Sequence, residues 1–203
     1  MTNSRDRDVA YQVAHIIAKL DKLVLSEDPI ARIEIVRQQP SKEDAGRGSY
    51  FRYVTAGERI GERYVIFIIG IEDFLQEELR QKRHLALVKN RDQESWEETP
   101  LFTREELLIA IASHEVRHRL QNHAPITIFS QQNTSQVVSL KLMGAVLAEL
   151  FERGLSGGNI QREYDAKVIE YLVAKEAHSH FGKFQLEKIA EVIKTTPGDF
   201  INK

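Results

Sequence analysis

The stretch TREELLIAIASHEVRHRLQNH, residues 103–123, decides how the second half of the chain folds. Thr103 can cap the first turn of a helix while Glu106 reaches back to the threonine amide, a capping box that predicts a helix from Thr103 to about Asn122. Successive residues of a helix are turned by about 100 degrees, so four side chains of this stretch lie on one face, within about 60 degrees of one another. They are Leu107, Ile111, His114 and His118. The stretch therefore predicts a packed helix that carries two histidines toward the interior.

His114, Glu115 and His118 form an HExxH pattern on that helix. Because the two histidines are four residues apart, they stack on adjacent turns and can offer imidazole nitrogens to a single ion about 2 Å away. Glu115 lies on the edge of the same face, where its carboxylate can take a proton from a water activated by the ion. The pattern predicts a Zn²⁺ site with Glu115 as the catalytic base. The alternative is a pair of histidines that are hydrogen-bonded in the core.

A catalytic zinc ion needs a third protein ligand, and the chain has no cysteine that could supply a thiolate. His123 lies nine residues after His114, on the opposite side of a continuous helix, and is expected to be a surface or helix-end histidine. Glu163 begins a second helical segment, where small neighbours would let two helices approach closely. These neighbours are Ala166, Val173 and Ala177. We predict Glu163 as the third ligand; the alternative is an ion pair between Glu163 and Lys167, four residues later.

Two segments of the chain together resemble the zincin metallopeptidases of the gluzincin type. One is the HExxH pattern at 114–118, and the other is Arg162-Glu163-Tyr164-Asp165-Ala166, in which a glutamate is followed three residues later by alanine. The second segment is similar to the glutamate helix of the integral-membrane CAAX-protease type and of the soluble ImmA/IrrE type. Without membrane spans, the soluble ImmA/IrrE-like family is the closer analogue. The resemblance covers about Thr103 to His180.

The resemblance implies a zinc-dependent metallopeptidase that hydrolyses peptide bonds with a metal-activated water. The zinc ligands would be His114, His118 and Glu163, and Glu115 would be the catalytic residue. A peptide or protein substrate is the implied partner, and an extended substrate could pair with a strand at 50–55 or at 63–71. The sequence does not indicate an oligomeric state.

The chain departs from the family pattern at two positions. Arg117 stands where the motif helix usually has an uncharged residue, and Lys167 stands where aspartate or asparagine is usual. Because Arg117 lies about 80 degrees from the mean direction of the histidines, we expect it to leave toward solvent. Both departures favour an alternative function, a catalytically inactive zincin-like protein that acts in regulation or partner binding.

A second alternative is a helical interaction module without metal. It would follow if His114 and His118 point into a closed core with Glu163 far away. The cluster His178-Ser179-His180 could supply a transition-state donor or another ligand. Adjacent histidines are more often helix-end or surface residues, so they are left outside the predicted site.

The rest of the chain predicts an α+β fold, with a small, mainly antiparallel sheet in the N-terminal half and helices in the C-terminal half. Apolar spacing indicates a helix at about 8–25, and alternation indicates strands at 31–36, 50–55 and 63–71. Residues 72–89 favour helix, with a short strand possible at 84–88, and 40–49 and 90–100 read as polar loops. Further helices are expected at about 135–153, 160–180 and 184–194. One zincin-like domain, 1–203, would comprise a packing helix (1–29), a sheet-rich part (30–100) and a helical part with the metal site (101–203).

The charge and hydropathy of the chain exclude some partners. Lys and Arg number 28 against 30 Asp and Glu, and the net charge of −2 provides no basic field for nucleic acid or anionic lipid. The longest apolar run, 64–71, is too short to span a bilayer, and residues 1–7 do not resemble a signal peptide. We therefore expect a soluble, cytoplasmic protein without a membrane or nucleic-acid partner.

Overall fold

The computed structural model describes residues 4–29, 31–41, 50–55, 61–80, 87–89, 96–98, 103–134, 137–138, 140–152, 154, 158–179 and 185–200. It confirms the predicted α+β class, with a small sheet in the N-terminal half and helices mostly in the C-terminal half. The first elements are α1 (Ser4–Val24), β1 (Arg32–Val36), β2 (Phe51–Val54), β3 (Arg63–Phe67), α3 (Ile71–Arg80), β4 (Leu87–Lys89) and β5 (Trp96–Glu98). Then follow α4 (Arg104–His123), α5 (Leu140–Glu152), α6 (Gly158–Ser179), α7 (Leu186–Lys194) and the 3₁₀ helix η2 (Pro197–Phe200).

The three-stranded sheet has the order β1-β3-β2 and is mixed. β2 and β3 pair antiparallel, as expected for two strands joined by a hairpin, whereas β1 and β3 pair parallel. β3 lies between β1 and β2. It pairs antiparallel with β2, which directly precedes it in sequence, and parallel with β1, which does not. β4 and β5 form a separate antiparallel pair. The loop prediction for 90–100 is therefore wrong at 96–98, and most of the predicted loop at 40–49 lies outside the described residues.

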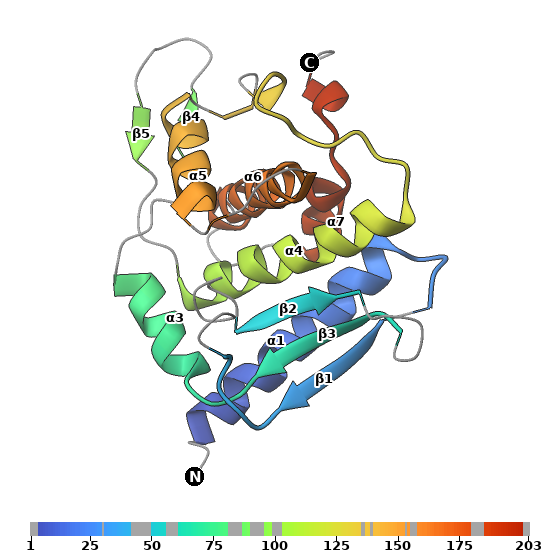
Figure 1. Ribbon diagram of the computed structural model, residues 1–203, viewed down its shortest axis with the longest axis vertical. Coiled ribbons are helices and arrows are strands. Elements are labelled where there is room, and N and C mark those ends of the chain that lie inside the picture. The colour runs from blue at the N-terminus through green and yellow to red at the C-terminus, as the bar shows by residue number, and fades with distance from the viewer. Residues whose placement is uncertain are drawn as a thin grey trace.

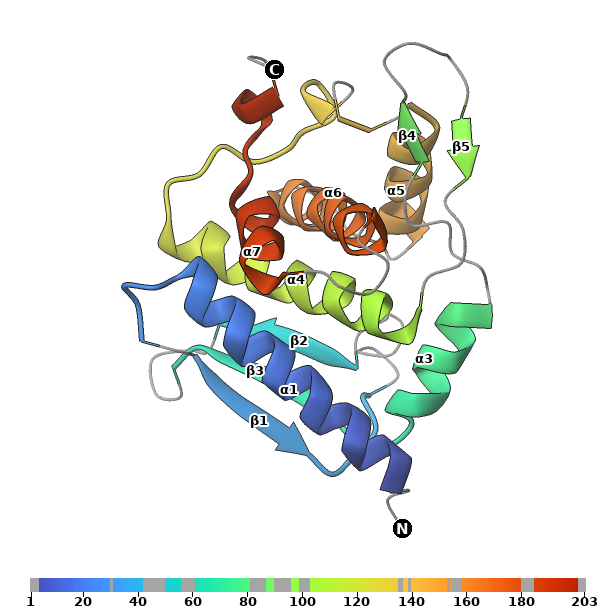
Figure 2. The same ribbon diagram turned by 180° about the vertical axis from the view of Figure 1, so that it is seen from behind.

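The helix α1 lies across one face of the sheet, as the two opposite views of the molecule show (Figures 1 and 2). It packs against β1 and β3 and also contacts α3, α4 and α7. Its apolar residues recur at helical spacing and are buried, so burial of this face drives the packing. The buried apolar residues are Val9, Ala10, Val13, Ile17, Leu20 and Val24. The packing helix is thus confirmed, beginning at Ser4 rather than at about Asp8.

The helix α4 lies between β2 on one side and α6 on the other (Figure 1). The predicted capping box is present: Glu106 N donates to Thr103 Oγ1 at 3.3 Å, and Thr103 N donates to Glu106 Oε2 at 2.9 Å. Every residue from Ala112 to Arg117 is buried, so neighbours cover this part of the helix on all sides. The helix that carries the histidines is therefore a central element of the core.

The prediction that Arg117 leaves toward solvent is wrong. Its side chain is completely buried, and it donates from Nε and Nη2 to the two oxygens of Asp165, at 2.7 and 2.9 Å. Its Nη1 donates to the carbonyl oxygen of Ile193 in α7 at 2.6 Å. A helical wheel shows directions within one helix but not what lies around it, and both α6 and α7 pack against α4. Arg117 joins three helices.

A second buried arginine joins α4 to the N-terminal half. Arg119 Nη1 donates to Asp21 Oδ2 in α1 at 2.6 Å, and its Nη2 donates to the carbonyl oxygen of Pro29 at 2.6 Å. Tyr64 in β3 donates to the other oxygen of Asp21 at 2.7 Å. Because buried charges are tolerated only when they are paired and hydrogen-bonded, these contacts fix α4 relative to α1 and the sheet.

No helix among the residues that the structure describes has the length and apolar character needed to cross a bilayer.

We predict that Arg117→Met lowers the free energy of unfolding by about 3–5 kcal/mol, because it leaves the Asp165 carboxylate buried without its charged partner. Urea denaturation of the metal-free protein measures this change. Arg104→Met is the matched control on the same helix, since Arg104 pairs with Glu72 while 27% of its side chain is exposed. That pair is expected to contribute less than about 1 kcal/mol. Equal losses in the two variants would contradict the prediction.

Candidate metal centre

The interface between α4 and α6 brings the three predicted ligands together. His114 and His118 extend from adjacent turns of α4, and Glu163 extends from the early part of α6. The Nε2 atoms of the two histidines are 3.1 Å apart. Glu163 Oε1 lies 3.3 Å from His118 Nε2, and Glu163 Oε2 lies 3.4 Å from His114 Nε2. These three side chains form a group that could hold a metal ion.

The separations between the three groups fit a tetrahedral ion. Zinc binds imidazole nitrogen and carboxylate oxygen at about 2.0–2.1 Å, which places tetrahedral ligand atoms about 3.3–3.4 Å apart. The observed separations of 3.1, 3.3 and 3.4 Å are close to these values. Glu163 Oε2 is also buried and accepts no hydrogen bond, so a cation would satisfy it. The donor set fits zinc.

The side chains of the group differ in their exposure to solvent. The side chain of His114 is 8% exposed, whereas that of Glu163 is 24% exposed. A catalytic zinc site keeps one coordination position for water or substrate, while a structural zinc site is closed by four protein ligands. Three converging ligands with a partly exposed carboxylate match the first arrangement.

The predicted ligands His114 and Glu163 shift each other's pKa values. Burial lowers the pKa of His114, but the carboxylates of Glu163 and Glu170 outweigh it and raise this pKa to about 10. Burial raises the pKa of Glu163, but the two imidazoles outweigh it and hold this pKa far below its usual range. These two shifts both favour a charged His114 beside a charged Glu163.

Groups behind the two histidines contact their other ring nitrogens. Glu170 Oε2 lies 3.1 Å from His114 Nδ1, and Gln121 Oε1 lies 3.1 Å from His118 Nδ1. A proton on each Nδ1 would leave each Nε2 free to bind an ion. Glu170 is itself paired with Lys167. Burial raises the pKa of Glu170, but the charge of Lys167, followed by the contact with His114, outweighs burial and lowers this pKa to about 2.

Glu115 lies beside the ligands and is held by the sheet. Its Oε2 accepts a hydrogen bond of 2.6 Å from the backbone N–H of Tyr53 in β2. Burial raises its pKa, although the charges of His114 and His118 oppose this. A carboxylate with a raised pKa is a stronger base than an ordinary one while it is ionised. Glu115 therefore has the surroundings expected of a general base.

The other histidines of the C-terminal half are placed away from the ligands. His123, the last residue of α4, lies 3.2 Å from Asp28 and also pairs with Glu62, which agrees with the prediction of a helix-end histidine. His178 Nδ1 lies 3.4 Å from Glu106, near the start of α4. His180 lies outside the described residues. None of these observations adds a ligand to the group.

Sequence reasoning missed three contributors to the site: Glu170, Gln121 and the amide of Tyr53. Glu170 is seven residues after Glu163, and Gln121 is three residues after His118, so helical spacing placed both on the ligands' faces. Those spacings were the available signal. The Tyr53 contact had no such signal, because it joins β2 to α4 across a long separation in sequence.

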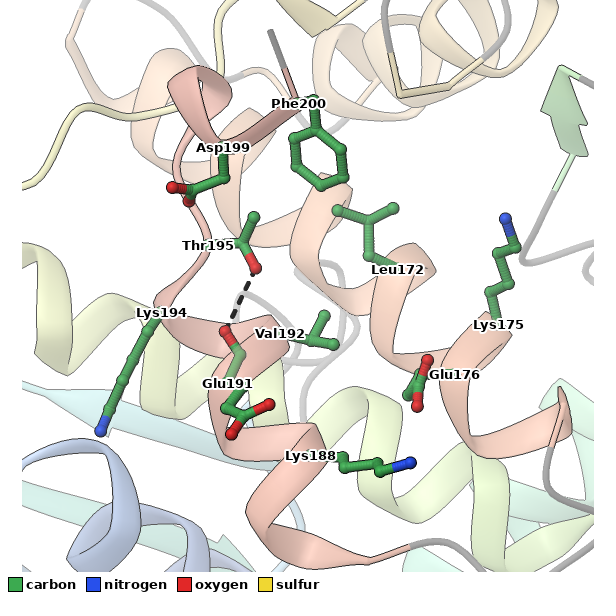
Figure 3. Close-up of a pocket in the computed structure, with 10 residues that line it drawn as sticks. All are labelled: Leu172, Lys175, Glu176, Lys188, Glu191, Val192, Lys194, Thr195, Asp199 and Phe200. Atoms are coloured by element: carbon green, nitrogen blue, oxygen red, sulfur yellow. Dashed lines mark hydrogen bonds between the residues drawn. The ribbon is translucent and has the colours of Figure 1, made fainter. Parts of the chain in front are cut away.

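A separate pocket of about 740 Å³ lies between α6, α7 and η2 (Figure 3). It contains none of the ligands. Around it, three lysines face three acidic residues, so its charge favours neither an anion nor a cation. The charged residues are Lys175, Lys188, Lys194, Glu176, Glu191 and Asp199. We assign it no function.

Comparisons with known proteins identify no relative: no protein family, no curated protein and no solved structure matches this chain. The assignment of the site therefore depends on its geometry and chemistry alone.

We predict that the purified protein binds one zinc ion per chain and that Glu163→Gln weakens this binding. The loss should exceed the roughly 10–100-fold effect typical of removing a group behind the ligands, because a ligand itself is removed. Competition with a chelator of known affinity measures it. Glu176→Gln, on the same helix but outside the group, is the matched control. Equal zinc affinity in the two variants would mean that Glu163 is no ligand.

Zinc binding should also release protons. At pH 7, below the His114 pKa of about 10, the metal-free imidazole is protonated and must lose a proton to bind an ion. Zinc affinity is therefore expected to rise with pH, with about one proton or more released per ion near pH 7. Titration calorimetry in buffers of different ionisation enthalpy measures the number. A binding enthalpy that does not depend on the buffer would contradict this prediction.

Proposed function

We propose that the protein is a zinc-dependent metallopeptidase of the gluzincin type, similar to the soluble ImmA/IrrE-like family. His114, His118 and Glu163 are the zinc ligands in this proposal, and Glu115 is the general base. The observation that carries it is the convergence of the three ligand side chains beside a buried carboxylate. A peptide or protein is the proposed substrate, and the cytoplasm is the proposed location.

In the proposed reaction, zinc would activate the carbonyl and the water, and Glu115 would transfer the proton. When bound, zinc would polarise the scissile carbonyl and lower the pKa of a coordinated water toward neutrality. Glu115 takes the proton from the attacking water and later delivers it to the leaving amine. The hydrogen bond from Tyr53 N fixes one oxygen of this carboxylate and leaves the other for the proton. The raised pKa of Glu115 suits a group that must both accept and return a proton.

The strand β2 is the better of the two strands considered for holding an extended substrate. β3 is paired on both sides, whereas β2 is at the edge of the sheet and contacts α4. Phe67 N donates to Tyr50 O, so alternation turns the backbone groups of Phe51 and Tyr53 away from β3. Tyr53 N already binds Glu115 on that side. A substrate paired with this edge would therefore lie next to the general base.

The two departures from the family pattern do not oppose the proposal. Arg117 is occupied by Asp165 and does not enter the ligand group, and Lys167 pairs with Glu170. The condition for a helical module without metal is not met either, because Glu163 lies next to both histidines. The remaining alternative is a zincin-like protein that binds zinc without cleaving peptides, and activity distinguishes it.

We predict that the zinc-loaded protein cleaves members of a peptide library and that Glu115→Gln lowers the rate by about 10²–10⁴-fold, the usual contribution of a general base. The amide keeps the shape of the side chain but cannot accept the proton. Mass spectrometry of the library measures cleavage, and metal analysis checks that the variant retains zinc.

Glu105→Gln is the matched control, since Glu105 is an exposed carboxylate on the same helix. Zinc binding by the wild-type protein without any zinc-dependent cleavage would reject the peptidase and leave the non-catalytic alternative. Full activity in the Glu115 variant would reject the assigned base.

A further inference from the structure

The helix α6 contacts both ring nitrogens of His114. Glu163 Oε2 lies 3.4 Å from His114 Nε2, and Glu170 Oε2 lies 3.1 Å from His114 Nδ1. The two glutamates are seven residues apart, about 10 Å along the helix axis, so they approach the imidazole from opposite ends. Glu170 is only 3% exposed. One helix therefore encloses the ring with two carboxylates, of which only one belongs to the ligand group.

The contact of Glu170 is directed at a nitrogen that otherwise has no hydrogen bond. His114 Nδ1 is buried and lacks an in-line hydrogen-bond partner in this conformation. Glu170 Oε2 lies within hydrogen-bonding distance of it, so only the alignment of donor and acceptor is missing. A buried N–H without an acceptor is costly, which favours that alignment. The carboxylate is thus placed to set the rotation of the ring and the direction of Nε2.

Lys167 neutralises this second carboxylate. Its Nζ lies 3.2 Å from Glu170 Oε1 and 3.0 Å from Glu170 Oε2, and its side chain is 11% exposed. An isolated buried carboxylate is expensive, whereas a paired one is tolerated. Lys167 precedes Glu170 by three residues on the same helix, so the pair is preformed within α6. The lysine lets α6 bury a carboxylate behind His114.

The Nδ1 atoms of the two histidines lie next to different kinds of group. His118 Nδ1 faces the neutral amide oxygen of Gln121, from its own helix, whereas His114 Nδ1 faces a charged group from the neighbouring helix. A charged acceptor binds an N–H about twice as strongly as a neutral one. Once aligned, a hydrogen bond from His114 Nδ1 to Glu170 would therefore constrain its ring more strongly than Gln121 constrains His118.

We infer that Glu170 is a positioning residue for the metal centre: it holds His114 through Nδ1 so that Nε2 faces the ion, and Lys167 acts by neutralising Glu170. This inference rests on the proposed zinc site but not on peptide cleavage. Glu170 acts through His114 and has no contact with substrate in this role. Loss of such a group typically weakens metal binding by about 10–100-fold.

The test compares zinc affinities of the full-length chain by chelator competition. Lys167→Met/Glu170→Met removes one charge of each sign, so net charge stays constant and a change reports the lost contact with His114. Glu170→Asp keeps the carboxylate but shortens its reach by one methylene. We expect both variants to bind zinc about 10–100-fold more weakly than the wild type. The aspartate variant keeps the test decisive if the double variant does not fold.

The matched control is Lys175→Met/Glu176→Met, a charge-balanced pair on the same helix outside the ligand group, which should keep wild-type affinity. Nitrogen-15 shifts of the His114 ring add a readout that a loss of stability would not change. In the zinc-bound wild type, Nδ1 should carry the proton, and the Glu170 variants should alter this signal. The unfolding midpoint of each metal-free variant checks the fold.

Zinc affinity within about twofold of wild type in both variants would overturn the inference, because a twofold change is far smaller than the expected loss. So would an equal loss in the control pair, or a wild-type His114 that binds zinc without a proton on Nδ1. In these cases the proposed zinc site stands. If the wild type binds no zinc, the inference and the proposed function both fail. The presence or absence of peptide cleavage does not affect the result.

Discussion

The buried ion pair between Arg117 and Asp165 is the interaction on which the geometry of the candidate metal site depends. Arg117 lies between the two histidine ligands in sequence, and Asp165 lies two residues after Glu163. Asp165 also accepts hydrogen bonds from Phe129 N and Gln121 Nε2, at 2.8 and 2.7 Å, so both its oxygens are fully used. A different rotation or register of α6 against α4 would leave buried charges unpaired, at a cost of several kcal/mol. The contact that makes the helices fit thus also brings the ligands together.

The sheet completes the site from the other side of α4. Tyr53 N fixes Glu115, and Arg119 joins the same helix to α1 and to the segment that precedes β1. Glu115 is therefore oriented by the N-terminal half, whereas the C-terminal half brings Glu163 to the two histidines. Because α4 is covered on all sides from Ala112 to Arg117, its rotation is fixed from both directions there.

The sequence predicted the parts of this arrangement that depend on local spacing. The capping box at Thr103, the shared face of His114 and His118, and the α+β class follow from helical and strand periodicity, and all three are present in the structure. The parallel ladder of β1 with β3 and the burial of Arg117 could not be predicted in the same way. Both depend on which distant segment becomes a neighbour, and periodicity within one segment does not contain that information.

The charges around the histidines favour a cation of one particular class. The carboxylates of Glu115, Glu163 and Glu170 surround the two imidazoles, and Lys167 supplies the ammonium group paired with Glu170. With neutral imidazoles, this set carries two negative charges, which a divalent ion would neutralise. Magnesium and calcium prefer oxygen ligands throughout, whereas two nitrogens with one carboxylate suit zinc and its transition-metal neighbours. Two of these carboxylates, Glu163 and Glu170, also raise the pKa of His114 to about 10, so the same groups favour a proton on that imidazole. The site is thus a set of acidic groups whose charge can be balanced either by protons or by a single metal ion.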